Sequence, residues 1–199
     1  MDSFFQIWGG DCYLLNKILL SSAEGREDSR KLRIWSWIFY LIGLPAWVII
    51  LVAKHDWIAA TIEAGGLPAM ILGLIVALQG SKRVPKLLDR FSGIFAFVLL
   101  GFGVLYSLYD YNGITSVSQV LEMGVMTGFL GGTYLLAKKI HSGWLLFVLM
   151  NTNMGLLMLI QNKPILAVQQ LISLCFVLNG FYRSFKNKKI VSCNSQTEE

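Results

Sequence analysis

Long apolar runs separated by short polar stretches make up most of this chain of 199 residues. Six runs stand out, at residues 34–53, 57–79, 91–109, 113–137, 143–160 and 164–182. Each approaches the ~20 residues that an α-helix needs to cross a ~30 Å hydrocarbon layer. A membrane β-barrel would instead show alternating segments of about ten residues, which these runs do not contain. The pattern therefore predicts an all-α, polytopic membrane helix bundle.

The first apolar part of the chain, residues 3–20, is more ambiguous. It is about long enough to span a membrane, yet it contains a Gly-Gly pair, Asp11, Asn16 and Lys17. An Asp or a Lys at the centre of a spanning helix costs ~3 kcal/mol on insertion scales. The stretch lacks the basic start and the cleavage site of a signal peptide. We interpret it as either a poor seventh spanning helix or an interfacial amphipathic helix.

These runs predict six or seven transmembrane helices without a separate soluble domain. We expect an N-terminal segment at residues 1–33, a transmembrane bundle at 34–183 and a cytoplasmic tail at 184–199. Three connections on one side of the membrane are very short, at residues 54–56, 110–112 and 161–163. Short connections predict tight hairpins, in which sequential helices lie antiparallel and adjacent.

The composition agrees with a membrane protein, because 55% of the residues are hydrophobic and only 15% are charged, against roughly 25% charged in soluble domains. The net charge of +5 would suit nucleic acid if the basic residues formed one patch. They alternate between loops instead, with the richest groups at residues 21–33, 82–90, 138–139 and 183–189. This positive-inside pattern predicts that loop 21–33 and the C-terminus are cytoplasmic. The lipid bilayer is the expected partner, and nucleic acid is not.

Motifs for enzymatic chemistry are weak. His55 and His141 fall in loops on opposite predicted sides of the membrane, so they cannot share a metal ion. Cys12, Cys175 and Cys193 have neither metal-ligand spacing nor a paired framework. A phosphate-binding loop and a nucleophile elbow are both missing from the sequence. We expect no catalytic residues, no metal and no cofactor.

Polar residues inside the predicted spans are candidates for a functional site, because each is costly to place in hydrocarbon. Six of these stand out: Glu63, Gln119, Glu122, Asn151, Gln169 and Asn179. Glu63, Gln119 and Gln169 also take equivalent positions when the predicted hairpins are aligned, and internal repeats are typical of transporters. Two alternatives remain: Glu63 could reach the outer headgroups, and the amides could only join helices, at ~0.6 kcal/mol each.

A resemblance to a known family begins at residue 138 and continues to residue 183. This stretch contains a basic loop, then Trp144, then Asn151 seven residues later, Gln161 at the outer turn, Gln169, and an Asn179-Gly180 pair. It resembles the closing part of the PnuC family of bacterial nicotinamide riboside transporters. The match covers about a quarter of the chain closely and about two-thirds loosely.

The resemblance implies a fold similar to the SWEET sugar transporters, with two three-helix bundles joined by a linker helix. Residues 3–20 and the first two strong runs would form one bundle, the third run the linker, and the last three runs the second bundle. Seven spans and an outside N-terminus follow from this mapping. The resemblance also implies a multi-pass protein of the bacterial inner membrane, which we expect to be a homo-oligomer.

The family is thought to facilitate uptake of a small-molecule vitamin, which a kinase inside the cell then traps by phosphorylation. The resemblance implies that Trp144 stacks on the base, while Asn151 and Gln169 bind the ribose or the amide. This chain departs from the family at Gly43, where we expect an Asn, and it lacks the Trp that usually follows the final Gly. The alternatives are a carrier of thiamine or riboflavin, a non-transporting membrane subunit or scaffold, and an unrecognised intramembrane enzyme.

Overall fold

The computed structural model describes the backbone of residues 2–26, 29–79 and 85–196, and the side chains of 4–26, 29–79 and 85–186. The regular structure of these residues is helical: α1 (Asp2–Ala23), α2 (Arg30–Ala53), α3 (Trp57–Gly65), α4 (Leu67–Gln79), α5 (Lys86–Asp110), α6 (Val117–Ala137), α7 (Ser142–Ile160) and α8 (Pro164–Gln196). Six helical segments are long and apolar enough to cross a membrane, which confirms the predicted bundle. The basic residues Lys82 and Arg83 lie outside the described residues, as do the side chains of Lys188, Lys189 and Cys193.

Four helices end in the same tight turn, which explains the short connections. The residue after the C-cap of α2, α5, α6 and α7 has a positive φ, at His55, Asn112, Lys139 and Asn162 respectively. The next backbone N–H then bonds back to the helix, for example from Gly113 to the carbonyl of Leu108 at 2.8 Å. This left-handed geometry satisfies the free carbonyls at a helix end and reverses the chain within a few residues.

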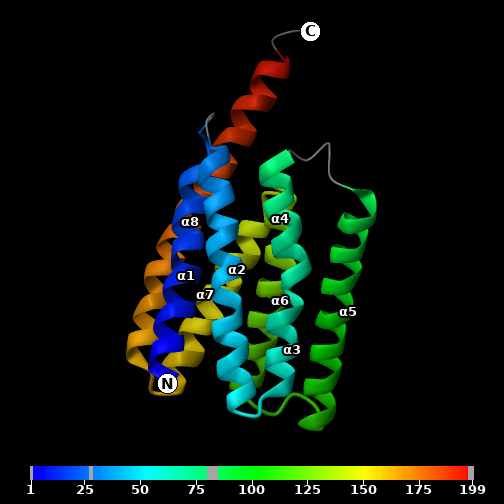
Figure 1. Ribbon diagram of the computed structural model, residues 1–199, viewed down its shortest axis with the longest axis vertical. Coiled ribbons are helices and arrows are strands. Elements are labelled where there is room, and N and C mark those ends of the chain that lie inside the picture. Colours follow the sequence, from blue (N-terminus) through cyan, green and yellow to red (C-terminus); the bar gives the residue numbers. More distant parts are fainter. Residues whose placement is uncertain (1, 27–28, 80–84, 197–199) are drawn as a thin grey trace.

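The helices form a ring with one helix outside it. Around the ring, α1 packs on α2, α2 on α4, α4 on α6, α6 on α7, α7 on α8, and α8 returns to α1. Helix α5 lies outside, against α3, α4 and α6 (Figure 1). The helices before α5 and those after it each follow one another around the ring. The two three-helix bundles with a linker that the resemblance implies stay a prediction.

Helix α1 is a member of the ring and packs along α2 and α8, although it is not one of the six segments of the described chain that are long and apolar enough to cross a membrane. Both interpretations of residues 3–20 stay predictions. The helix runs beside α2, and the two chain ends lie at opposite ends of the bundle (Figure 1). Its polarity is reversed relative to a soluble helix: Asn16 and Lys17 are buried, whereas Phe4 and Ile7 are exposed. The neighbouring helices cover the polar groups that made this stretch unfavourable as an isolated span.

The run at residues 57–79 consists of α3 and α4, which meet at Gly66 while its backbone stays helical (φ −70°, ψ −19°). Pro68 has no N–H, so it cannot bond to the carbonyl one turn earlier as a continuous helix requires. The hydroxyl of Ser92 in α5 donates to the carbonyl of Pro68 at 3.1 Å. At the other end of the chain, α8 continues to Gln196, well past the predicted end of the last span at residue 182.

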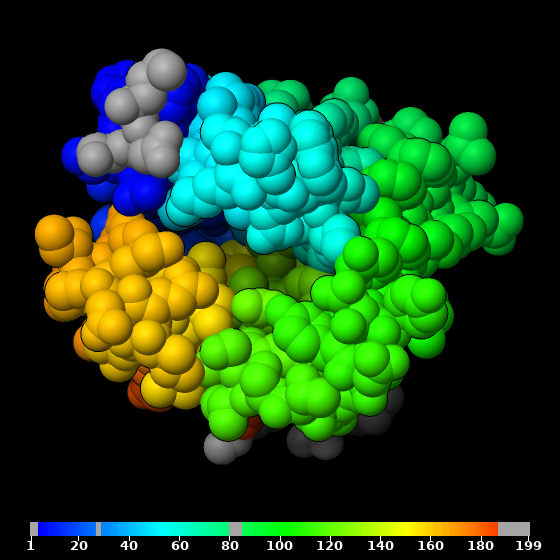
Figure 2. All heavy atoms as spheres, turned by 90° about the horizontal axis from the view of Figure 1, so that it is seen from below, coloured from blue at the N-terminus to red at the C-terminus, as the bar shows by residue number. Residues whose placement is uncertain are grey.

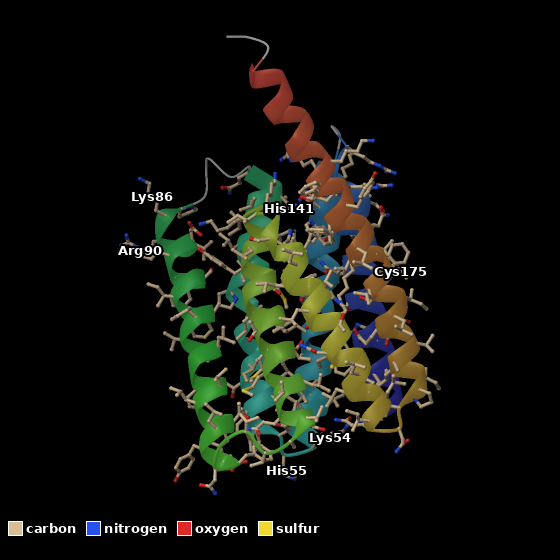
Figure 3. The ribbon with its side chains drawn as sticks, turned by 180° about the vertical axis from the view of Figure 1, so that it is seen from behind. Lys54, His55, Lys86, Arg90, His141 and Cys175 are labelled. Atoms are coloured by element: carbon tan, nitrogen blue, oxygen red, sulfur yellow. The ribbon has the colours of Figure 1, made fainter. Side chains whose placement is uncertain are left out.

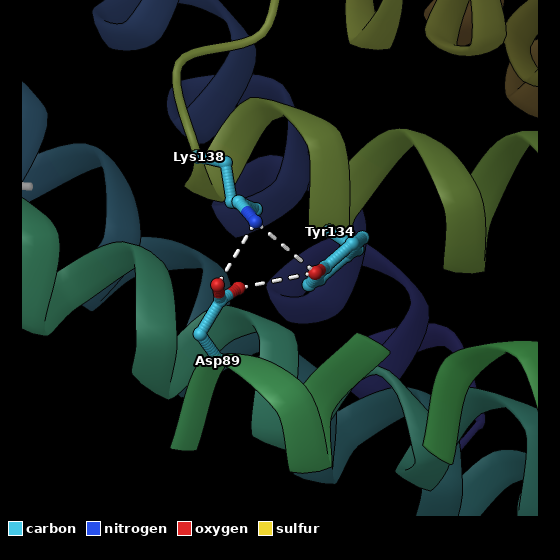
Figure 4. Close-up of polar contacts among 3 residues, drawn as sticks. All are labelled: Asp89, Tyr134 and Lys138. Atoms are coloured by element: carbon cyan, nitrogen blue, oxygen red, sulfur yellow. Dashed lines mark hydrogen bonds and ion pairs between the residues drawn. The ribbon is translucent and has the colours of Figure 1, made fainter. Parts of the chain in front are cut away.

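Polar groups fasten α5 to α6 at both ends. At one end, Asp89 of α5 accepts from the Tyr134 hydroxyl at 3.0 Å and pairs with Lys138 at 2.9 Å (Figure 4). The hydrogen bond with Asp89 raises the pKa of Lys138 above its ordinary value, so Lys138 stays charged at neutral pH. At the other end, the Gln119 amide of α6 donates to the carbonyl of Ser107 in α5 at 3.1 Å.

The two ends of the bundle separate the loops as the charge pattern predicts. His141 lies at the same end as Lys86 and Arg90, whereas His55 lies beside Lys54 at the opposite end (Figure 3). We call these the inner end and the outer end, following the predicted topology.

In intact cells, a maleimide that cannot cross the membrane should label His55→Cys but not His141→Cys in a chain without its native cysteines. With the native sequence, Cys193 should stay unmodified until the cells are opened. The reverse labelling pattern would show that the C-terminus is outside.

Candidate functional site in the ring interior

Helix α1 supplies the polar residues at the centre of the candidate site. Tyr13 and Lys17 are four residues apart, so they lie on one face of the helix and about 6 Å apart along its axis. Lys17 is 3% exposed and is the one charged residue among the fully buried side chains of the described residues. A buried ammonium needs compensating partners, because several kcal/mol of hydration are lost on burial.

Asn151 of α7 is the partner of Lys17. The Lys17 ammonium donates to Oδ1 of Asn151 at 2.8 Å, and the Ser173 hydroxyl of α8 donates to the same oxygen at 2.7 Å. The Asn151 amide nitrogen donates back to the carbonyl of Phe147 at 2.6 Å, which orients the oxygen toward α1. One amide therefore joins α1, α7 and α8 inside the ring.

A second cluster lies around Glu63, one turn along α1 from Lys17. The Tyr13 hydroxyl donates to the Glu63 carboxylate of α3. The ring of Tyr13 packs edge-on against Tyr40 of α2 at 4.6 Å between centroids, and the Tyr40 hydroxyl lies 3.2 Å from that of Thr133 in α6. Helices from both halves of the chain therefore share this cluster.

Gly43 allows Tyr13 to reach Glu63. A Cβ at Gly43 would lie 2.8 Å from Cδ1 of the Tyr13 ring and 2.8 Å from Cβ of Cys12, so any larger residue would displace α1 or the ring.

The two clusters face the same interior. Tyr13, which bonds to Glu63, and Lys17 lie on one face of α1, and Lys17 and Glu63 form no direct ion pair among the described residues. Seen from the outer end, the bundle is hollowed between the α2–α3 hairpin, the start of α6 and the α7–α8 hairpin (Figure 2). The interior thus holds one positive and one negative side chain beneath an indentation of the outer face.

Three of the residues predicted from the sequence belong to this interior. Asn151 and Glu63 are members of the two clusters. Gln169 of α8 is half-buried, and its amide lies on Gly10, where a Cβ would come within 2.5 Å of Nε2. Gln169 is one turn before Ser173 on α8, so it lies on the same face, nearer the outer end.

The other predicted site residues lie elsewhere. Trp144 is 1% exposed, and its ring lies on Gly180, so it offers no open face for stacking. Gln119 bonds to Thr115, Ser107 and Gly113 at the α5–α6 turn. Glu122 is exposed on α6, with Asp56 as its charged neighbour. Asn179 is exposed on α8.

The predicted residues did not include Lys17, Tyr13, Tyr40, Thr133 or Ser173. The signal for Lys17 was present, because a charged residue in an apolar stretch indicates function by default. In the sequence, Lys17 counts as evidence against a spanning helix at residues 3–20 and is not predicted to be a site residue. The two tyrosines and two hydroxyls carry no such signal, since these residue types are common in apolar helices.

No protein-family model, curated protein or solved structure matches the chain. Among the described residues, no group of three or more His, Cys, Asp or Glu side chains could hold a metal ion.

Proposed function

We propose that this chain is a membrane transporter that facilitates the passage of a small nucleoside-like vitamin. The observation that carries the proposal is the convergence of Tyr13, Lys17, Glu63 and Asn151, from helices of both halves, on the interior of one ring. Ionisable residues at membrane depth mark solute pathways more often than structural sites. Transporter sites of this kind lie between the two repeated halves of the chain.

The junction between α3 and α4 supports the same function as a hinge. Glu63 lies three residues before Gly66, which keeps a right-handed helical conformation (φ −70°, ψ −19°), and the N–H of Met70 bonds to the Gly66 carbonyl at 3.0 Å. Pro68 lacks the N–H that would complete the ladder, so this part of the segment is suited to bending. Rocking of one three-helix group against the other, with α5 as the connection, would expose the interior to each side in turn.

Nicotinamide riboside is the first candidate solute, on the strength of the resemblance to the PnuC family. Its aromatic ring suits Tyr13, and its ribose hydroxyls suit the amide of Gln169, both of which are half-buried. Trapping by phosphorylation inside the cell would then drive net uptake through a facilitator in the bacterial inner membrane. Thiamine, riboflavin and deoxynucleosides remain alternative solutes, and a homo-oligomer remains the expected assembly.

A non-transporting subunit or scaffold is the competing function. It would use the interior groups only to join helices, and an apolar interior of equal volume would serve as well or better, because buried charges seldom add net stability. Lys17 and Glu63 lie in the same interior without forming a direct ion pair. This favours a solute-binding site over a contact that only joins helices.

Binding of the candidate solutes should raise the melting temperature of the purified protein, because a ligand that binds only the folded state stabilises it by mass action. At 100 times the dissociation constant the stabilisation is about 2.7 kcal/mol. The screen would contain nicotinamide riboside, thiamine, riboflavin and deoxynucleosides. Uptake of the same radiolabelled solute into sealed vesicles, recovered unchanged, separates transport from an enzymatic activity.

Glu63→Gln should reduce that binding by about ten-fold or more, since a hydrogen bond to a charged group contributes ~1.5–3 kcal/mol. Glu122→Gln is the matched control, because Glu122 is exposed and away from the two clusters, and it should bind as the native protein does. A loss in the control with full binding by Glu63→Gln would move the site to the outer part of α6.

A further inference from the structure

The Lys17 ammonium has more N–H donors than hydrogen-bond partners. An ammonium group has three N–H donors, and Asn151 is its one hydrogen-bond partner among the side chains that the structure describes. The Asn151 oxygen is also shared with Ser173, and an amide oxygen accepts no more than two such bonds. Two of the three N–H donors thus have no acceptor among the described residues.

The oxygens near these donors do not satisfy them. Oδ1 of the neighbouring Asn16 is fully buried and has no hydrogen-bond partner in the described structure, yet it does not bond to Lys17. Asn16 turns instead to α2, where its amide donates to the Ser36 carbonyl at 3.0 Å. Glu63, the opposite charge, is engaged by the Tyr13 hydroxyl. Lys17 is therefore a buried amino group whose hydrogen-bonding capacity the described residues do not fill.

We propose that Lys17 is a substrate-binding residue and that the transported solute presents a carboxylate to it. The inference rests on the proposed function and refines the solute class. Tyr13, whose hydroxyl donates to Glu63, is four residues from Lys17 on α1, about 6 Å along the helix axis. This spacing suits a zwitterionic solute whose carboxylate meets Lys17 and whose positive ring lies toward Glu63 and Tyr13. A neutral amide in place of the carboxylate would bond to Lys17 without the charge contribution.

A purely structural Lys17 is the alternative. The contact with Asn151 does join α1 to α7, but an uncharged donor would do so without the cost of desolvating an ammonium. The uncharged variant Lys17→Gln tests this distinction, because it keeps a donor for Asn151 and removes the charge.

The test compares two ribosides that share ring and sugar and differ in one group: nicotinic acid riboside has a carboxylate where nicotinamide riboside has a carboxamide. Their dissociation constants would be measured for the full chain in lipid nanodiscs. The native protein should bind the acid about ten-fold or more tightly than the amide, as expected for a charge-assisted bond. Lys17→Met and Lys17→Gln should abolish that preference, while Lys54→Met, which removes a charge from the outer turn, should retain it.

Three outcomes would overturn the inference. If the native protein prefers the amide, or binds both ribosides equally, Lys17 does not hold a carboxylate, although the proposed transport of ribosides stands. If the acid preference persists in a folded Lys17→Gln variant, another residue determines it. If neither riboside binds the native protein or enters vesicles containing it, the inference and the proposed solute class both fail.

Discussion

Asn151→Leu is expected to lower the free energy of unfolding of the bundle by about 3 kcal/mol, because it leaves the buried Lys17 ammonium without its acceptor. An ordinary hydrogen bond between membrane helices contributes only ~0.6 kcal/mol. The larger value follows from the charge, since an unpaired buried ion costs more than a lost neutral bond. Denaturant titration of the detergent-solubilised protein, followed by tryptophan fluorescence, would measure the change.

Thr152→Leu is the matched control for this substitution. Thr152 is the next residue on α7 and is exposed, so the change should alter stability by less than about 0.5 kcal/mol. Equal losses in the two variants would show that Lys17 does not depend on Asn151.

The double variant Lys17→Met/Asn151→Leu distinguishes a solute-binding site from a contact that only joins helices. Removing both partners eliminates the unpaired charge, and such replacements are often neutral or stabilising. Stability should therefore return, with a coupling of about 2 kcal/mol in the double-mutant cycle. A scaffold would regain its function together with its stability. A transporter that uses Lys17 would fold and still fail to bind its solute.

Gly128→Ala is expected to destabilise the protein by about 1–3 kcal/mol, the usual cost of overpacking a well-packed core. A Cβ at Gly128 of α6 would lie 2.5 Å from the backbone carbonyl oxygen of Leu146 and 2.8 Å from the backbone N of Met150 in α7. Backbone atoms cannot rotate away as a side chain can, so the two helices must separate. Thermal unfolding of the purified protein would report the loss.

Gly101→Ala provides the control, because nothing lies within 4 Å of a Cβ at Gly101 in α5. Alanine is the better helix former by ~1 kcal/mol in water, so this variant should be as stable as the native protein or more so. If Gly101→Ala and Gly128→Ala unfolded alike, the close approach of α6 and α7 would be wrong.

Much of the fold follows from local properties of the chain. The length and apolarity of six runs determine six spanning helices, because the hydrocarbon layer admits only elements that satisfy their own backbone. The distribution of Lys and Arg predicts the same separation of loops that the structure has, with Lys86 and Arg90 at one end and Lys54 at the other. Asn112 and Asn162, at two of the turns, are residues that tolerate the left-handed conformation required there.

Other features of the fold depended on contacts between distant segments. Residues 3–20 are an unfavourable span when judged alone, and they become favourable when Lys17 meets Asn151, 134 residues later. A hydropathy average is taken over residues that are neighbours in the sequence, so it cannot include a partner from a distant segment.

The same division applies to the candidate site. The sequence alone selected Glu63, Asn151 and Gln169, because a polar group at membrane depth is costly wherever it lies. It could not distinguish these from Gln119, whose bonds fasten a turn, or from Asn179, which is exposed. Which polar groups face the same interior depends on the rotation of each helix about its axis, and that rotation is set by packing between helices. Only the tertiary structure therefore brought Tyr13 and Lys17 of α1 beside residues of α3 and α7.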